Sequence, residues 1–247
     1  MAPEDILIAP DAKITDSGGK PIDPETAREA LLENRVKNGK MRVAVSRILE
    51  GEILGPMRFK RFKDCAEIRG LKLAYAWLNN IDSKDHNSLL VWDGTQTVGY
   101  LIDFGTALGA DAGRGGPKNP CAGWTHIVDL KVFSMELLTL GLYQSGCDRK
   151  ELPINPRVGL FSKRLEPLGW KPYAPNLAFE EMNNEDGQWI AERIARLSDE
   201  QLSAAVEAGQ YSDPRDAETL VEILKARRRP ILEAYQVTER NAHDSAI

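Results

Sequence analysis

Cysteine is scarce in this sequence. Only Cys65, Cys121 and Cys147 occur among the 247 residues. Their wide spacing and odd number offer neither a disulfide framework nor a Cys-x-x-Cys zinc motif. We therefore expect buried or idle thiols, in a protein of a reducing compartment.

Long apolar runs and an excess of positive charge are also missing. No stretch approaches the roughly 20 apolar residues of a membrane-spanning helix, and the N-terminus lacks the pattern of a secretion signal. The 32 basic and 37 acidic residues give a net charge of -5, which does not favour a nucleic-acid partner. A hydrophobic content of 42% is sufficient for a globular core. The sequence thus predicts a soluble, cytoplasmic protein with no membrane span and no nucleic-acid partner.

Periodic patterns predict the elements of the first half of the chain. Apolar residues recur every three or four positions in residues 24–36 and 65–78, which predicts a helix in each. Residues 41–49 alternate like a strand. Two β-type runs, 89–92 and 98–102, flank a turn with an Asp-Gly pair, so we expect a hairpin there.

Capping signals predict a helical second half. Residues 128–143 have helical character, and the chain after about Asp186 is expected to be chiefly helical packing. Ser198 and Asp213 have the residue type and spacing of helix N-caps. The basic run at residues 225–229 is interpreted as a solvated helix face.

Candidate chemistry is concentrated in four residues. Phosphoryl transfer requires a carboxylate that orients the acceptor, a cation near the phosphates, and oxygen ligands for Mg²⁺. Asp82 matches the first requirement and Lys84 the second. Asn87 and Asp103 match the third.

The predicted hairpin explains how distant ligands could meet. A chain that enters one strand at Asn87 and leaves the other at Asp103 returns to the same end of the hairpin. Gly105 would then let the backbone turn away, and Phe104 would pack inward and fix the aspartate. Each residue also has a purely structural interpretation, in which these polar side chains cap turns, but that interpretation does not explain their order.

These motifs resemble the catalytic and metal-binding loops of the protein-kinase-like superfamily. Asn87 lies five residues after Asp82, and residues 103–105 read Asp-Phe-Gly, as in the family pattern. Asn80 and Ile81 replace the usual His-Arg pair, which is closer to the HipA-like, phosphatidylinositol-kinase-like and aminoglycoside-phosphotransferase-like branches. The amino-acid sequence of several longer segments, between about residues 42 and 229, is similar to that of a group of uncharacterised bacterial kinase-like proteins.

The resemblance implies an α+β fold. It implies a mainly helical kinase-like C-lobe with a catalytic β-hairpin at residues 57–247, and a remnant of the N-lobe sheet with the hinge at residues 1–56. The hinge residues whose backbone would meet the adenine of ATP are Ile48, Leu49 and Glu50. Lys84 would be the catalytic-loop lysine.

The sequence departs from the family pattern upstream of this hinge. A Gly-rich loop, a strand lysine and its glutamate partner do not fit into the preceding residues, so we expect most of the N-lobe to be missing and little activity from this chain alone. The predicted function is an ATP- and Mg²⁺-dependent phosphotransferase, with Mn²⁺ as a possible substitute, acting on an unknown acceptor. One alternative is a pseudokinase or partner-binding scaffold without turnover.

A second alternative is a metal-dependent hydrolase. It would use Asp82, His86, Asp103 and His126 as its site. His126 and Asp129, three residues apart, could be metal ligands on one helix face, although a hydrogen-bonded or solvated pair is the commoner arrangement. His86 is interpreted either as a phosphate contact or as a loop surface residue.

Overall fold

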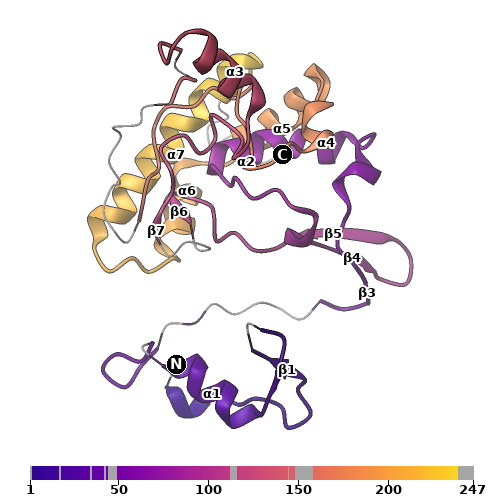
Figure 1. Cartoon of the computed structure of the whole chain (residues 1–247), viewed down its shortest axis with the longest axis vertical. Helices are drawn as coiled ribbons and strands as arrows, with labels where there is room; N and C mark the ends of the chain where they lie inside the picture. The colour runs from indigo at the N-terminus through magenta and orange to yellow at the C-terminus, as the bar shows by residue number, and fades with distance from the viewer. Residues whose placement is uncertain are drawn as a thin grey trace, which may run out of the picture. The chain divides into compact units, whose positions relative to one another are not determined.

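A computed structural model describes residues 2–16, 18–33, 35–41, 43, 49–111, 116–143, 145–147 and 158–238. The chain divides into two compact units, Met1–Glu50 and Gly51–Ile247, each described by itself (Figure 1). The mixture of helices and small antiparallel sheets confirms a mixed α+β class. No helix among the described residues has the length and apolar character needed to cross a membrane.

The first unit contains short elements. They are η1 (Pro3–Asp5), the antiparallel pair β1 (Ile14–Thr15) and β2 (Pro21–Ile22), and α1 (Pro24–Leu32). Asp23 caps α1 by accepting hydrogen bonds from two amides of its first turn, and Pro24 occupies its first position. The helix predicted at residues 24–36 is therefore confirmed but ends earlier. Most of the strand predicted at residues 41–49 lies outside the described residues.

The second unit is built around a central helix. Its helices are α2 (Ala66–Leu78), α3 (Leu130–Leu138), α4 (Leu177–Glu180), α5 (Asn184–Ala195), α6 (Asp199–Glu207) and α7 (Pro214–Ala234), with 3₁₀ turns η2 (Phe59–Phe62) and η3 (Asp85–Asn87). α2 packs against α4, α5 and α7 (Figure 1). Leu73 and Trp77 on one face of α2 join the larger core with residues of α5 and α7, and Tyr75 and Ala76 join a second core beside Phe179.

The predicted helix starts are confirmed. Ser198 and Gln201 form a capping box at α6, and Asp213 caps α7 immediately before Pro214. The helices predicted after about Asp186 are present as α5, α6 and α7. α3 lies within the predicted helical stretch at residues 128–143 but is shorter.

The predicted hairpin is also confirmed. β4 (Ser88–Trp92) and β5 (Thr97–Leu101) pair antiparallel, and β3 (Glu52–Gly55) adds to the free side of β4. The turn contains Gly94 at a positive φ of 98°, which a glycine adopts without strain. A separate two-stranded sheet joins β6 (Ala110–Asp111) and β7 (Gly116–Pro117).

Two interpretations of the sequence are wrong. Cys121 and Cys147 form a disulfide, whereas Cys65 is a free and exposed thiol. Cysteines 26 residues apart meet because the chain between them, which includes α3, leaves and returns to the same place. Within the run at residues 225–229, Arg227 and Arg228 are buried rather than solvated, because backbone carbonyl oxygens surround the guanidinium of Arg227 and Asp199 pairs with that of Arg228.

Candidate functional site

The candidate site begins at the C-terminus of α2. Asn79 takes a left-handed conformation with φ of 49°, which asparagine tolerates better than most residues. The amide of Asn80 then donates to the Tyr75 carbonyl oxygen over 2.8 Å and closes the helix. Ile81 is fully buried, so the chain crosses the core edge and delivers Asp82 to the start of the following loop.

Buried side chains anchor the end of α2 from several directions. Asn79 accepts at its carbonyl oxygen from the Lys118 ammonium and at Oδ1 from Trp170 Nε1, the latter over 2.9 Å. Arg227 donates from Nε to Trp77 O (2.9 Å) and from Nη2 to Ala76 O (2.6 Å). Distant residues thus donate to the last carbonyl oxygens of α2, where intrahelical donors become scarce.

The same network connects the loop to the chain after Asp103. Thr106 Oγ1 donates to Asn80 Oδ1 over 2.6 Å, and both residues are buried. The Tyr173 amide donates to Ile81 O over 2.8 Å. The two segments that carry the predicted site are therefore held together next to the predicted catalytic aspartate.

Asn87 closes the loop that begins at Asp82. Its side-chain Nδ2 donates to the main-chain carbonyl oxygen of Asp82 over 2.9 Å, and its amide donates to Lys84 O over 3.0 Å. The side chain is buried, and its use of Nδ2 as a donor leaves Oδ1 as an oxygen that a ligand could use. The five-residue offset between Asp82 and Asn87 thus corresponds to a closed structural loop.

Asp82 carries an unusual carboxylate. Its Oδ2 pairs with Lys84 Nζ at 3.1 Å, with the Asp82 side chain 15% and the Lys84 side chain 64% exposed. Its Oδ1 is buried and has no hydrogen-bond partner among the described residues. A buried oxygen without a donor costs about 1–3 kcal/mol, so such groups call for an explanation.

Asp103 leaves the hairpin at the end where Asn87 enters it. Ser88 pairs with Leu101, and the Ile102 amide donates to Asn87 O over 2.9 Å. The structure therefore joins these two backbones as the sequence predicts. A cation shared by the Asn87 and Asp103 side chains stays a prediction.

The local conformation at Asp103 differs from the expectation. Asp103 itself has the positive φ, at 54°, and its exposed side chain accepts at Oδ1 from the Gly105 amide over 3.2 Å. The turn thus depends on an aspartate that binds its own backbone rather than on the glycine. Phe104 does not pack inward, since 51% of its surface is exposed.

A cavity of about 350 Å³ lies beside Asp82. Asp82, Lys84 and His86 line one side, and the chain at residues 173–177 lines the other. Asn176 ties the two sides together by donating from Nδ2 to Ser83 O over 3.3 Å. The cavity wall includes Asp82 and Lys84 but neither Asn87 nor Asp103.

Burial changes the pKa of two residues near this loop. Burial, together with the negative charge of Asp82, raises the pKa of Tyr75 to about 12. Burial and the charge of Arg227 lower the pKa of Lys118 to about 7, and Asp111 opposes that shift. Sequence reasoning did not identify Lys118 or Arg227, because nothing local to either residue indicates that it contacts the end of α2.

The structure does not test the predicted hinge. Ile48 is outside the described residues, and Leu49 and Glu50 belong to the first unit. Leu49 is half-buried and Glu50 exposed, and neither is in a helix or strand. A contact of these three residues with adenine therefore stays a prediction.

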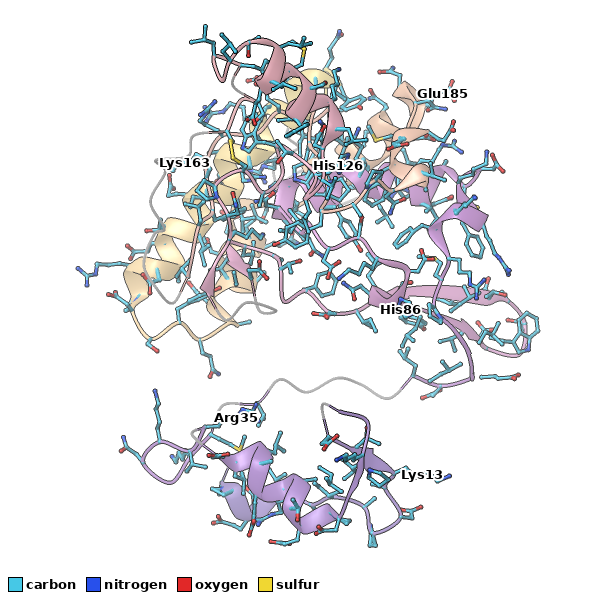
Figure 2. All side chains as sticks on the ribbon, viewed as in Figure 1. Lys13, Arg35, His86, His126, Lys163 and Glu185 are labelled. Carbon is cyan, nitrogen blue, oxygen red and sulfur yellow. A yellow bond between two sulfur atoms is a disulfide. The ribbon has the colours of Figure 1, made fainter. Side chains whose placement is uncertain are left out.

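The histidines do not converge on one centre. His86 lines the cavity beside Asp82, whereas His126 lines a different cavity, and Figure 2 shows the two well apart. His126 Nδ1 lies 2.7 Å from Pro172 O, and Asp129 caps α3 and binds Lys171 Nζ at 2.6 Å. Both side chains are thus hydrogen-bonded, as expected, but each to another residue. They do not share a helix face, because His126 precedes α3 and Asp129 is its N-cap.

In the part of the chain that the structure describes, no three His, Cys, Asp or Glu side chains gather as a set of metal ligands. The four residues that the sequence singled out still group in two places. One loop carries Asp82, Lys84 and Asn87. Asp103 follows β5, the strand that pairs with β4 where that loop ends. Comparison with models of known protein families, with curated proteins and with solved structures finds no match to this chain.

Proposed function

We propose that this chain is an ATP- and Mg²⁺-dependent phosphotransferase of the kinase-like type. The observation that carries the proposal is that Asp82, a residue that lines a cavity, has a buried carboxylate oxygen, Oδ1, without a partner among the described residues. A carboxylate in this state is suited to accept the hydrogen of a bound hydroxyl group. Binding of an acceptor hydroxyl, with a small rotation of the side chain, would satisfy the oxygen.

Lys84 supports this role by its position. It holds the other carboxylate oxygen of Asp82 and is itself more than half exposed on the same cavity. Its charge offers a cation to a phosphate that approaches the acceptor. In this proposal Asp82 orients the acceptor hydroxyl and takes its proton, while Lys84 offsets the phosphate charge.

Asn87 and Asp103 would hold the metal. An amide oxygen and an exposed carboxylate are the hard oxygen ligands that Mg²⁺ prefers, and Mg²⁺ commonly takes its remaining ligands from phosphates and water. The donor set therefore fits a cation that arrives with a nucleotide, with Mn²⁺ as a substitute. When bound, Mg²⁺ would offset the negative charge of the phosphates. The contribution of this chain is to fix Asn87 through its bond to Asp82 and Asp103 through its turn.

The second candidate is a pseudokinase or scaffold that binds nucleotide without turnover. It is favoured by the exposed Asp103 side chain and by the fact that neither metal candidate lines the cavity beside Asp82. Phosphoryl transfer depends mainly on positioning, so a metal ion held away from the Asp82 carboxylate would remove most of the rate.

Turnover distinguishes the two candidates. Release of phosphate from radiolabelled ATP is measured with Mg²⁺, with Mn²⁺ and with EDTA, for the wild type and Asp82→Asn. Glu207→Gln, which removes an exposed carboxylate on α6, is the matched control. We expect a low rate of metal-dependent release that Asp82→Asn abolishes and the control keeps. Nucleotide binding without any release would support the scaffold, and release that Asp82→Asn does not change would refute the proposed role of Asp82.

A further inference from the structure

The outer face of α3 exposes an unusual amount of apolar surface. The α3 patch comprises Leu130, Phe133, Leu137 and Leu138 on the helix and Leu140 and Leu142 after it, each between 65% and 92% exposed. Leu130, Phe133 and Leu137 recur at steps of three and four residues and therefore form one stripe, which Leu138 widens at its end. Amphipathic helices normally bury such a stripe, but in α3 the half-buried apolar side chains are Val132 and Met135 on the other face.

The area of this patch is large for a surface that stays in water. Six side chains of this size, about three-quarters exposed, present on the order of 700 Å² of apolar surface. The largest apolar patch on a typical monomer is about 300–600 Å², and a standard stable interface takes about 800 Å² from each partner. The α3 patch is thus of the size that one partner contributes to a stable complex.

A cavity lies directly beside the patch. It has a volume of about 760 Å³, and Ile127, Val128, Leu130 and Phe133 are among its lining residues. Ile127 and Val128 are themselves well exposed, so the apolar surface extends from the helix into the cavity. The face therefore combines a protruding stripe and a hollow.

The protruding part includes a strained leucine. Leu140 has φ of 50° and is 92% exposed. A leucine in the left-handed region costs on the order of 1–2 kcal/mol, and among the described residues the Leu140 side chain has almost no burial to offset that cost. An exposed apolar side chain held in this conformation is suited to insert into a partner.

The disulfide holds this face in one shape. Cys121 lines the cavity, and its bond to Cys147 closes the loop that carries α3 and all members of the α3 patch. A closed loop loses less entropy on binding, which favours a preformed contact surface.

From this geometry we infer that the α3 patch binds a second copy of the same chain and forms a two-fold dimer. A two-fold axis places identical patches against each other, so Leu140 and Leu142 of one copy face the cavity of the other, and the reverse. The interface would then bury a standard area from each copy and place apolar side chains in both cavities. This inference does not depend on the proposed function, because α3 and the β3–β4–β5 sheet lie on opposite sides of the second unit (Figure 1).

A membrane surface fits the patch less well. Interfacial helices carry lysine and arginine on their polar face, which attract anionic lipids. α3 has Lys131 and Glu136 as its charged residues, Asp129 precedes it, and the whole chain has a net charge of -5.

The test is the mass of the full-length chain in solution by sedimentation equilibrium from about 1 to 100 µM, without reductant. We expect twice the monomer mass of 27.5 kDa for the wild type. Leu137→Glu should shift the protein to monomer, with a dissociation constant raised at least about 100-fold. Leu140→Gly should raise it about tenfold, while the relief of backbone strain keeps the monomer folded. Leu168→Glu, at another exposed leucine, is the control and should stay dimeric.

Circular dichroism of each variant confirms that the monomer is folded. A wild type that stays at 27.5 kDa over the whole range would overturn the inference. So would a dimer that Leu137→Glu and Leu140→Gly leave intact. A monomeric wild type that sediments with phosphatidylserine vesicles would assign the patch to a membrane instead and also overturn it.

Discussion

The Asn87 side chain donates from Nδ2 to the main-chain carbonyl oxygen of Asp82 over 2.9 Å. This bond joins the proposed acceptor-orienting residue to a proposed metal ligand, so the two cannot move independently. It also fixes the direction of the Asn87 amide and leaves its Oδ1 for a ligand.

Two replacements of Asn87 separate the stability that its bond to Asp82 provides from its proposed role as a metal ligand. We expect both Asn87→Ala and Asn87→Asp to lower the free energy of unfolding by about 1–2 kcal/mol, because each leaves the Asp82 carbonyl without its donor. Asn87→Asp keeps a hard oxygen ligand and Asn87→Ala does not, so only alanine should also abolish Mg²⁺-dependent nucleotide binding. Urea unfolding and ATP titration measure the two effects. Equal nucleotide affinity in wild type and Asn87→Ala would remove Asn87 from the metal site.

Arg227 should be a major contributor to stability. Its buried guanidinium donates to the carbonyl oxygens of Ala76, Trp77, Ser162 and Arg164. Replacement by methionine leaves these acceptors without their donor, so we expect a loss of about 3 kcal/mol or more in the free energy of unfolding. Arg229 lies two residues away on α7 and is exposed, so Arg229→Met should change stability by less than about 0.5 kcal/mol. Similar losses in the two variants would show that Arg227 does not hold the end of α2.

Lys118 should make stability depend on pH. Its pKa in the folded chain is about 7, below its ordinary value of 10.5. Between these values the unfolded chain binds more protons, so stability rises with pH and the gain is complete above the unfolded pKa. Relative to Lys118→Met, the unfolding free energy of the wild type should increase by on the order of 1–2 kcal/mol from pH 7 to pH 9. A difference between wild type and variant that stays constant over this range would contradict the assignment.

The contact of Arg227 with the end of α2 is one that no local sequence pattern could indicate. Helix starts and the hairpin were predictable because their signals lie within a few residues, as with Ser198 and Gln201 or the Asp-Gly pair in the turn. Arg227 and Ala76 are 151 residues apart in the sequence, and only the packing of α7 on α2 brings them together. A run of basic residues gives no information on which of its members that packing buries.

In the candidate site too, features that depend on nearby residues were predictable, and features that depend on the rest of the fold were not. The sequence predicts that Asn87 and Asp103 enter and leave one hairpin, because β-pairing follows from nearby residues. It does not predict that Asp103 takes the left-handed conformation while Phe104 stays exposed, because both depend on balances of about 1 kcal/mol in a single turn. Nor does spacing indicate that Cys121 and Cys147 meet, since their proximity depends on the path of the chain around α3.

Titration of ATP into the full chain tests the central proposal most directly, by calorimetry with saturating Mg²⁺ and again with EDTA. We expect binding with Mg²⁺ that weakens at least about tenfold in EDTA, equivalent to ~1.4 kcal/mol. Asp103→Asn should show the same loss with Mg²⁺ present, because it removes a charged oxygen ligand, while Glu207→Gln should bind like the wild type. Equal affinity with and without Mg²⁺, or an Asp103→Asn variant that binds as tightly as the wild type, would contradict the proposed site.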